Sequence, residues 1–120
     1  MPTLIPRRLT EALEALADDP SLTVLAGGTD LMVDLNYGRR RPSGVLALRR
    51  LPELRGWRVD GDDVVLGAAV TYTELLDPAL ADRVPALAAA ARTVGSPQVR
   101  NTGTIGGNLA TASPAGDTLP

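Results

Sequence analysis

The chain has 120 residues and a formal net charge of −2, and it contains no cysteine, histidine or lysine. This length suits one domain or two small lobes, and the charge gives no basic field for nucleic acid. Without cysteine the chain forms no disulfide, iron–sulfur cluster or thiolate zinc site. Without histidine, cysteine and lysine it is poorly equipped for acid–base, nucleophilic or metal catalysis, so we expect no catalytic residues and no metal ligands. We assign the chemistry of any reaction to a cofactor.

The amino-terminal residues 1–6 are too few and too interrupted by proline for a signal peptide. No apolar run in the sequence is long enough to span a bilayer. We therefore expect a cytoplasmic protein with no membrane span.

The first third of the chain alternates between short apolar runs and segments with helical spacing. The apolar runs predict three strands, over residues 3–5, 22–26 and 45–48. The segment between the first two predicts a helix that Thr10 caps and that ends before Asp19. The next segment predicts a helix from Thr29 or Asp30 to Gly38. The order βαβαβ is typical of a small parallel sheet.

The middle of the chain predicts a hairpin and two helices. Residues 57–60 and 64–66 are strand-like and flank the turn Gly61-Asp62-Asp63. A short helix begins at Thr71, and an alanine-rich helix covers residues 84–94.

The remaining residues, 98–120, are rich in glycine, asparagine, threonine, serine and proline, and they predict an ordered loop. Composition changes near residues 49–55. We therefore expect an amino-terminal lobe over residues 1–52 and a second lobe over residues 53–120.

A glycine pair lies between a predicted strand and a predicted helix in Leu25-Ala26-Gly27-Gly28-Thr29-Asp30-Leu31. Such a turn brings free N–H groups and the positive end of a helix dipole to one point, which suits a pyrophosphate group. A tight turn in which Thr29 or Asp30 only caps the helix is the simpler interpretation. This stretch alone favours the simpler one, because it is neither a G-x-G-x-x-G nor a Walker sequence.

A second glycine pair lies in Thr104-Ile105-Gly106-Gly107-Asn108. So many small hydrogen-bonding residues in a long loop favour a function over a linker between lobes, which is the alternative. Glycine lets the backbone approach a ligand closely. Together the two segments predict two halves of a clamp around a phosphate-bearing cofactor.

Two further features have weaker signals. Asp117 offers an acceptor for sugar or ribityl hydroxyls, although by itself a solvated turn residue is the better interpretation. The run Arg39-Arg40-Arg41 follows a predicted helix end, where cations suit the helix dipole. We interpret this run first as a solvated face and second as a contact to phosphate or a partner.

In combination these motifs resemble the flavin subunit of the molybdenum hydroxylases, the family of xanthine dehydrogenase and carbon monoxide dehydrogenase. The resemblance covers the whole chain in order. Its motifs are Ala26 to Met32, Gly38 to Pro42, Gly67-Ala68 before a threonine-capped helix, and Val99 to Pro114 followed by Asp117.

The resemblance implies an α+β fold, a two-lobed α/β FAD-binding domain of the PCMH type with a βαβαβ first lobe and an incomplete second lobe. It implies FAD as the cofactor. Leu25 to Leu31 and Thr104 to Asn108 would hold its pyrophosphate, the latter through backbone N–H groups and the threonine and asparagine side chains. Asp117 would contact the ribityl chain, and Val94-Gly95 would make an apolar contact with the cofactor.

The resemblance also implies partners and an electron path. A large subunit with a molybdenum cofactor would hydroxylate the substrate, and a small subunit with [2Fe-2S] clusters would pass the electrons to FAD and then to NAD or another acceptor. The family's flavin subunits continue well beyond Asp117, so we expect a fragment or a reduced site, with activity of this part alone doubtful.

Two alternatives remain. A self-contained flavin oxidase or cell-wall-precursor reductase would need acid–base residues that this chain hardly offers. A non-catalytic module that docks on partner subunits without stable flavin binding needs none.

Overall fold

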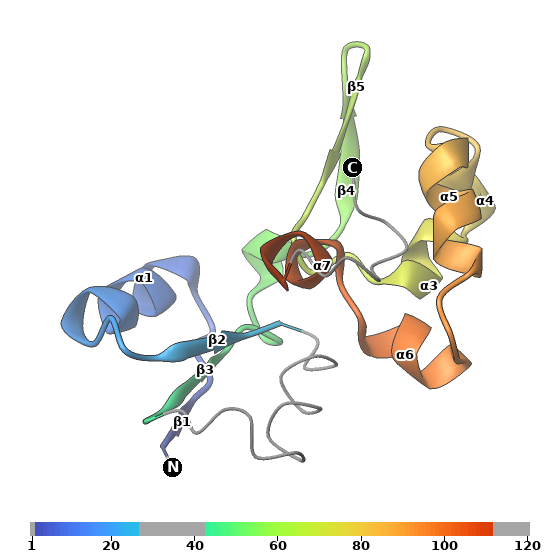
Figure 1. Ribbon diagram of the computed structural model, residues 1–120. Coiled ribbons are helices and arrows are strands. Elements are labelled where there is room, and N and C mark those ends of the chain that lie inside the picture. Colours follow the sequence, from blue (N-terminus) through green and yellow to red (C-terminus); the bar gives the residue numbers. More distant parts are fainter. Residues whose placement is uncertain (1, 27–42, 112–120) are drawn as a thin grey trace.

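The computed structural model describes residues 2–26 and 43–111 (Figure 1). Its first part contains β1 (Thr3–Leu4), α1 (Leu9–Asp18), β2 (Thr23–Leu25) and β3 (Val45–Ala47). The three strands form a parallel sheet in the order β1-β3-β2. The parallel sheet predicted from the sequence is confirmed. The helix predicted between Thr29 and Gly38 lies outside the described residues.

The first buried cluster joins α1 to this sheet. Leu46 pairs in register with Leu4 on one side and Val24 on the other, and it is fully buried. It packs with Ala12 of α1 and with Leu51, and further leucines surround these three. Burial of this leucine-rich helix face is the main source of stability for so short a sheet.

The start of α1 differs from the prediction. The helix begins at Leu9, and Arg8 is the N-cap residue, with no side-chain hydrogen bond. Thr10 is therefore inside the helix, and its predicted capping role is wrong. The Leu9 N–H instead donates to Oε2 of Glu53, at 2.5 Å, from a segment 44 residues away. A distant carboxylate thus satisfies the first free N–H of α1, whereas a local N-cap side chain would accept from the second or third.

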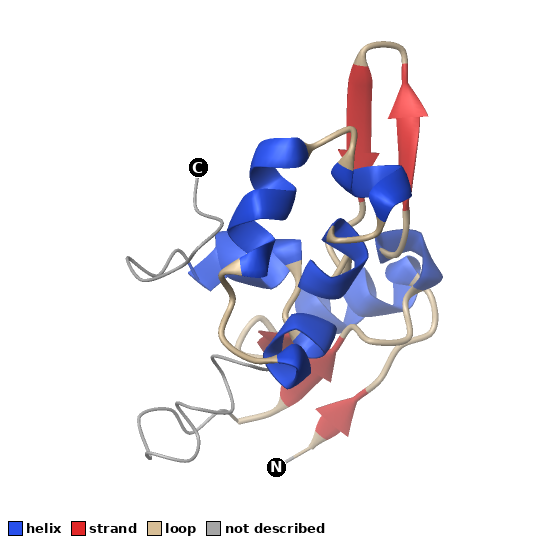
Figure 2. Cartoon of the chain, turned by 90° about the vertical axis from the view of Figure 1, so that its right-hand side faces the viewer, coloured by secondary structure: helices blue, strands red, loops and turns tan. Residues whose placement is uncertain are grey.

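A 3₁₀ turn, η1 (Pro52–Leu54), leads into the hairpin of β4 (Trp57–Asp60) and β5 (Asp63–Leu66). The predicted hairpin is confirmed, with β5 starting one residue earlier than expected. Gly61 in its turn has a φ of 61°, which favours glycine. Figure 2 shows the hairpin extending beyond the helices.

Three helices follow: α3 (Tyr72–Leu75), α4 (Pro78–Ala81) and α5 (Pro85–Arg92). The predicted Thr71 cap is confirmed, because Thr71 and Glu74 form a reciprocal capping box. The separate α4 is missing from the prediction, and it starts where the Asp77 side chain accepts from the Ala79 N–H. Within the described residues, no helix has the length and apolar character needed to cross a membrane.

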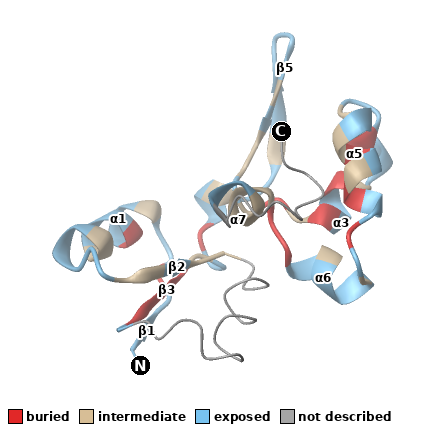
Figure 3. Cartoon of the chain, in the orientation of Figure 1, coloured by how far each residue is buried: buried red, intermediate tan, exposed pale blue. Residues whose placement is uncertain are grey.

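The second buried cluster lies among these helices. It consists of residues from α3, α4 and α5 and from the segments next to them: Val70, Tyr72, Leu75, Leu80, Ala91 and Val94. The hairpin residues Trp57, Val64 and Leu66 pack against it. Figure 3 shows that buried residues concentrate in β3, α3 and α5. The mixed α/β architecture is as predicted, whereas the division into lobes at residues 52 and 53 stays a prediction.

The predicted loop over residues 98–120 is wrong as far as residue 111. Helices α6 (Pro97–Thr102) and α7 (Ile105–Thr111) occupy this stretch. Ser96 caps α6 by accepting from the Val99 N–H, and Pro97 fits its first turn. Residues 112–120, including Asp117, lie outside the described residues.

Candidate functional site

The second glycine pair lies in the first turn of α7. Thr104 is the buried residue before this helix, with 7% of its surface exposed. Its hydroxyl accepts from the Gly107 N–H at 3.1 Å, and its carbonyl accepts from the Asn108 N–H at 3.0 Å. Thr104 therefore caps α7, so the glycine pair opens a helix that two weak helix formers would not predict.

Residues 68–70 fix this turn from outside. The Ile105 N–H donates to the Val70 carbonyl and the Gly106 N–H donates to the Ala68 carbonyl, both at 2.9 Å. A Cβ atom on Gly106 would lie 2.8 Å from both the Cβ and the carbonyl oxygen of Ala68. Glycine at 106 is therefore required by the close approach of two backbone segments.

Gly103 makes a similar contact one turn earlier. A Cβ atom there would lie 2.6 Å from the Tyr72 ring, and the Gly103 carbonyl accepts from the Tyr72 N–H at 3.2 Å. A β-bridge between Thr71 and Thr104 adds to this docking. Gly103 and Gly106 thus let α7 dock on residues 68–72, at the start of α3.

The described end of the first glycine segment, Ala26, lies beside the second glycine pair. The position of a Cβ atom on Gly107 is 3.8 Å from the Cβ of Ala26, the residue that follows β2. The structure therefore brings Ala26 next to Gly107, although they lie 81 positions apart in the sequence. Gly27, Gly28, Thr29, Asp30 and Leu31 lie outside the described residues.

Near the contact of Ala26 with Gly107, backbone and side-chain hydrogen-bond donors differ in whether they already have an acceptor. The backbone N–H groups of residues 105–108 all donate within the chain, to Val70, Ala68 and Thr104. A ligand would have to share them, so side chains are the freer donors. The Nδ2 atom of Asn108 is buried and has no hydrogen-bond partner in the described structure. The Thr104 hydroxyl still has its own proton to donate.

A buried amide without a partner is costly, and it indicates a missing acceptor. Asn108 Nδ2 fits the oxygen atoms of a phosphate-bearing ligand, in line with the predicted role of this segment. Cofactor contacts of residues 25–31, 104–108 and Asp117 stay predictions.

The predicted cofactor contact at Val94-Gly95 has a mixed environment. The Val94 side chain packs in the second buried cluster, and its carbonyl accepts from Nη1 of half-buried Arg100 at 2.7 Å. A Cβ atom on Gly95 would meet nothing within 4 Å, so this residue borders open space. Sequence reasoning missed the role of Arg100, because nothing local marks its partner.

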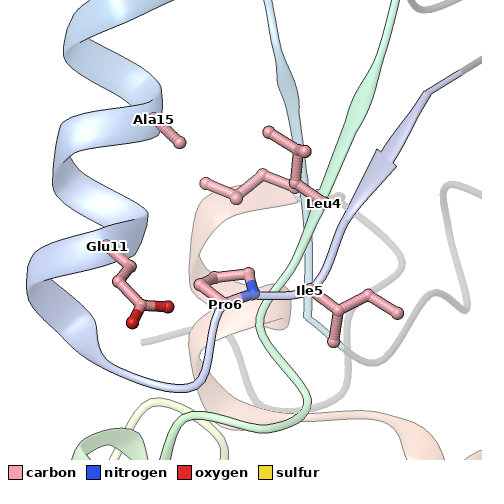
Figure 4. Close-up of a pocket in the computed structure, with 6 residues that line it drawn as sticks. Leu4, Ile5, Pro6, Glu11 and Ala15 are labelled. Carbon is pink, nitrogen blue, oxygen red and sulfur yellow. The ribbon is translucent and has the colours of Figure 1, made fainter.

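A hollow of about 270 Å³ lies elsewhere, between α1 and the sheet (Figure 4). Its lining is Leu4, Ile5, Pro6, Glu11, Ala15 and Leu46. None of the predicted cofactor residues lines it. The part of the chain that the structure describes also holds no cluster of three or more acidic, histidine or cysteine side chains suited to a metal.

Comparison with known proteins identifies the family. The sequence profile of the FAD binding domain in molybdopterin dehydrogenase matches residues 2–120. The nicotinate dehydrogenase FAD-subunit of Eubacterium barkeri is 43% identical over 116 residues, which cover 93% of this chain and 39% of that protein. The carbon monoxide dehydrogenase medium chain of Hydrogenophaga pseudoflava is 39% identical over 114 residues, covering 93% of this chain and 40% of its own.

The fold agrees with these sequences. A chain of reconstituted CO dehydrogenase from Oligotropha carboxidovorans superimposes with a TM-score of 0.93 at 31% identity, covering 98% of this chain and 42% of that one. This chain spans about two fifths of the length of the relatives it matches. The profile match includes both glycine segments and confirms the resemblance inferred from the sequence. The chain belongs to the family of FAD-binding domains of molybdopterin dehydrogenases.

Proposed function

We propose that this chain binds FAD as part of the flavin subunit of a molybdenum-containing hydroxylase or dehydrogenase. The observation that supports this most is the contact of Ala26 with Gly107, because it joins the two segments predicted to hold a pyrophosphate. The buried amide of Asn108, which has no partner among residues 2–26 and 43–111, is next to this contact in sequence and provides a donor for a phosphate oxygen.

Each segment then has a distinct task. The Asn108 amide and the Thr104 hydroxyl donate to pyrophosphate oxygens, and the small residues Ala26 and Gly107 leave space for the backbone to come close. Residues 27–31 complete the other side, and Asp117 accepts from the ribityl hydroxyls. Gly95 borders the cofactor without a side chain. FAD supplies the acceptance and onward transfer of electrons when bound, and the chain binds and orients it.

The proposed context is a multi-subunit complex. Relatives of this chain are a medium chain of carbon monoxide dehydrogenase and an FAD-subunit of nicotinate dehydrogenase. By analogy, a large subunit with a molybdenum cofactor and a small subunit with [2Fe-2S] clusters are the partners. Electrons from their clusters would pass through FAD to NAD or another acceptor. The cytoplasmic location remains part of this proposal.

Flavin retention tests the proposal directly. The purified chain is incubated with FAD and desalted, and its absorbance spectrum is recorded. We expect retained flavin bands, and a folded but colourless protein would contradict FAD binding by this chain. Asn108→Asp removes the donor and adds a negative charge opposite the phosphate, so FAD should bind roughly 10- to 100-fold more weakly, the range for a lost hydrogen bond to a charged group.

Asn101→Asp is the matched control. Asn101 is exposed on α6, and its Oδ1 accepts from the Thr73 hydroxyl at 2.5 Å, a bond that aspartate retains. This variant has the same change of charge, seven residues away in sequence, and should bind FAD like the parent chain. Circular dichroism checks that both variants fold, and Asn108→Ala replaces Asn108→Asp if the buried charge prevents folding. Equal FAD affinity of the Asn108 and Asn101 variants would remove Asn108 from the site.

One observation favours the alternative of a module that docks on partners without flavin. All four backbone N–H groups of residues 105–108 are bonded within the chain, which leaves fewer donors than the sequence predicted. Binding of the purified partner subunits by a chain that retains no FAD would support this alternative.

A further inference from the structure

The segment between the two buried clusters, residues 51–56, is bonded to both parts of the chain. Leu51 is fully buried in the first cluster, and Leu54 packs against it. On the other side, the Leu54 carbonyl accepts from the Ala69 N–H, and the Gly56 carbonyl accepts from the Gly67 N–H, each at 2.9 Å. We call residues 51–56 the connector. It is held on both sides, unlike a free linker.

Glu53 attaches the connector to α1. Its Oε2 atom accepts from the N–H of Leu9, the first residue of that helix, at 2.5 Å. This N–H has no partner within the helix, and the N-cap residue Arg8 makes no side-chain cap bond. A carboxylate at this position also meets the positive end of the helix dipole. The exposed Glu53 side chain therefore has a defined task in the fold.

The peptide group between Ala68 and Ala69 extends the connection to α7. Its N–H donates to the Leu54 carbonyl, and its C=O accepts from the Gly106 N–H, both at 2.9 Å. Because a trans peptide group is planar, these bonds leave it on opposite sides, and a displacement of the connector moves the start of α7 as well. Gly106 immediately precedes Gly107, which lies beside Ala26.

We propose that the connector sets the separation between Ala26 and Gly107, and that Glu53 is a positioning residue for the contact between them. The bonds form one path, from α1 through Glu53 and Leu54 to the Ala68–Ala69 peptide and then to Gly106. The link to cofactor affinity rests on the proposed function, whereas the separation itself is measurable without FAD.

The chain contains no cysteine, so two introduced cysteines can be spin-labelled without interference. Val24→Cys in β2 and Leu109→Cys in α7 are suitable, because these side chains are 46% and 52% exposed. Pulsed electron paramagnetic resonance then gives the distance distribution between the labels. It is recorded for the parent chain and for Glu53→Ala, Glu53→Gln and Asp77→Ala.

We expect a narrow distribution for the parent chain, a broader or shifted one for Glu53→Ala, and recovery in Glu53→Gln, which keeps an oxygen acceptor. Asp77→Ala is the matched control, because it removes a helix cap of α4 without touching the connector, and its distribution should equal that of the parent. An unchanged distribution in Glu53→Ala would overturn the proposal. Equal broadening in Glu53→Gln would overturn the role of the Oε2 acceptor.

FAD titration of the unlabelled variants tests the link to the site. Glu53→Ala should raise the Kd for FAD by at most about fivefold, the factor that corresponds to the whole stability of one helix cap, and Asp77→Ala should leave the Kd unchanged. A changed distance with an unchanged Kd would overturn the role of Glu53 in binding. A parent chain that binds no FAD would contradict the proposed function, while the distance measurement would still decide the role of the connector.

Discussion

Replacing Gly106 with alanine places a Cβ atom 2.8 Å from the Cβ and from the carbonyl oxygen of Ala68, and 3.2 Å from its Cα. Ordinary carbon contacts begin near 3.5 Å, so the two segments have to separate by several tenths of an ångström. The separation weakens the bonds from Gly106 to Ala68 and from Ile105 to Val70.

The contributions of Gly106→Ala to the free energy of unfolding have opposite signs and different magnitudes. Alanine favours a helix over glycine by about 1 kcal/mol. Overpacking costs about 1–3 kcal/mol, and each weakened hydrogen bond contributes about 0.5–1.5 kcal/mol. We therefore expect a net loss of about 1–5 kcal/mol in the free energy of unfolding, which lowers Tm by roughly 5 °C or more in a chain of this size.

Thermal and urea unfolding followed by circular dichroism measure this change. Gly95→Ala is the control, because its Cβ atom would meet nothing within 4 Å, and its stability should stay within about 0.5 kcal/mol of the parent. A Gly106→Ala chain as stable as the Gly95→Ala chain would refute the reasoning, since it would mean that α7 and Ala68 separate without cost.

Three further predictions concern the site, a cap and the core. Gly107→Val should abolish flavin retention in a folded chain, because its side chain meets the Thr104 hydroxyl and fills the space beside Ala26; retained flavin after desalting would contradict this. Thr71→Ala should cost about 1 kcal/mol in urea unfolding through loss of the capping box. Leu80→Ala should cost about 2–5 kcal/mol because Leu80 is fully buried, whereas Leu109→Ala, half-exposed, should cost far less, and equal losses would contradict the assigned core.

Local signals in the sequence predicted several elements correctly. Thr71 followed by Glu74 at the N3 position is a capping signature, and the structure has that box. Gly61 between two strand-like runs predicted the hairpin, and its positive φ explains the glycine. Each of these signals lies within a few residues, so the sequence contains the whole interaction.

Elements that depend on distant partners escaped prediction. The glycine pair in residues 106–107 indicated a loop, yet α7 forms because Ala68 and Val70 accept hydrogen bonds from its first turn. The predicted Thr10 cap of α1 was wrong, and the Leu9 N–H at the start of this helix donates to the distant Glu53. Tertiary contacts outweigh local propensity in both cases.

In the candidate site, too, the features that depend on neighbouring residues could be predicted, and those that depend on distant contacts could not. The residue types and the two glycine segments were apparent from the sequence, and so was the family. The approach of Ala26 to Gly107 depends on how two parts of the fold are placed, which no local pattern encodes. The use of the Ile105 and Gly106 N–H groups within the chain also could not be foreseen, because their acceptors, Val70 and Ala68, lie more than 30 residues away in sequence.

The peptide group between Ala68 and Ala69 makes hydrogen bonds to both Leu54 and Gly106, and this limits where the chain can change in length. An inserted residue between Gly67 and Val70 would rotate this peptide out of both bonds at once, detaching α7 and the connector together. An insertion at the exposed tip of the hairpin, at Gly61 and Asp62, would only lengthen a surface turn. Loop grafts, tags and reporter peptides therefore belong at the hairpin tip, and the short turn before α3 has to keep its length.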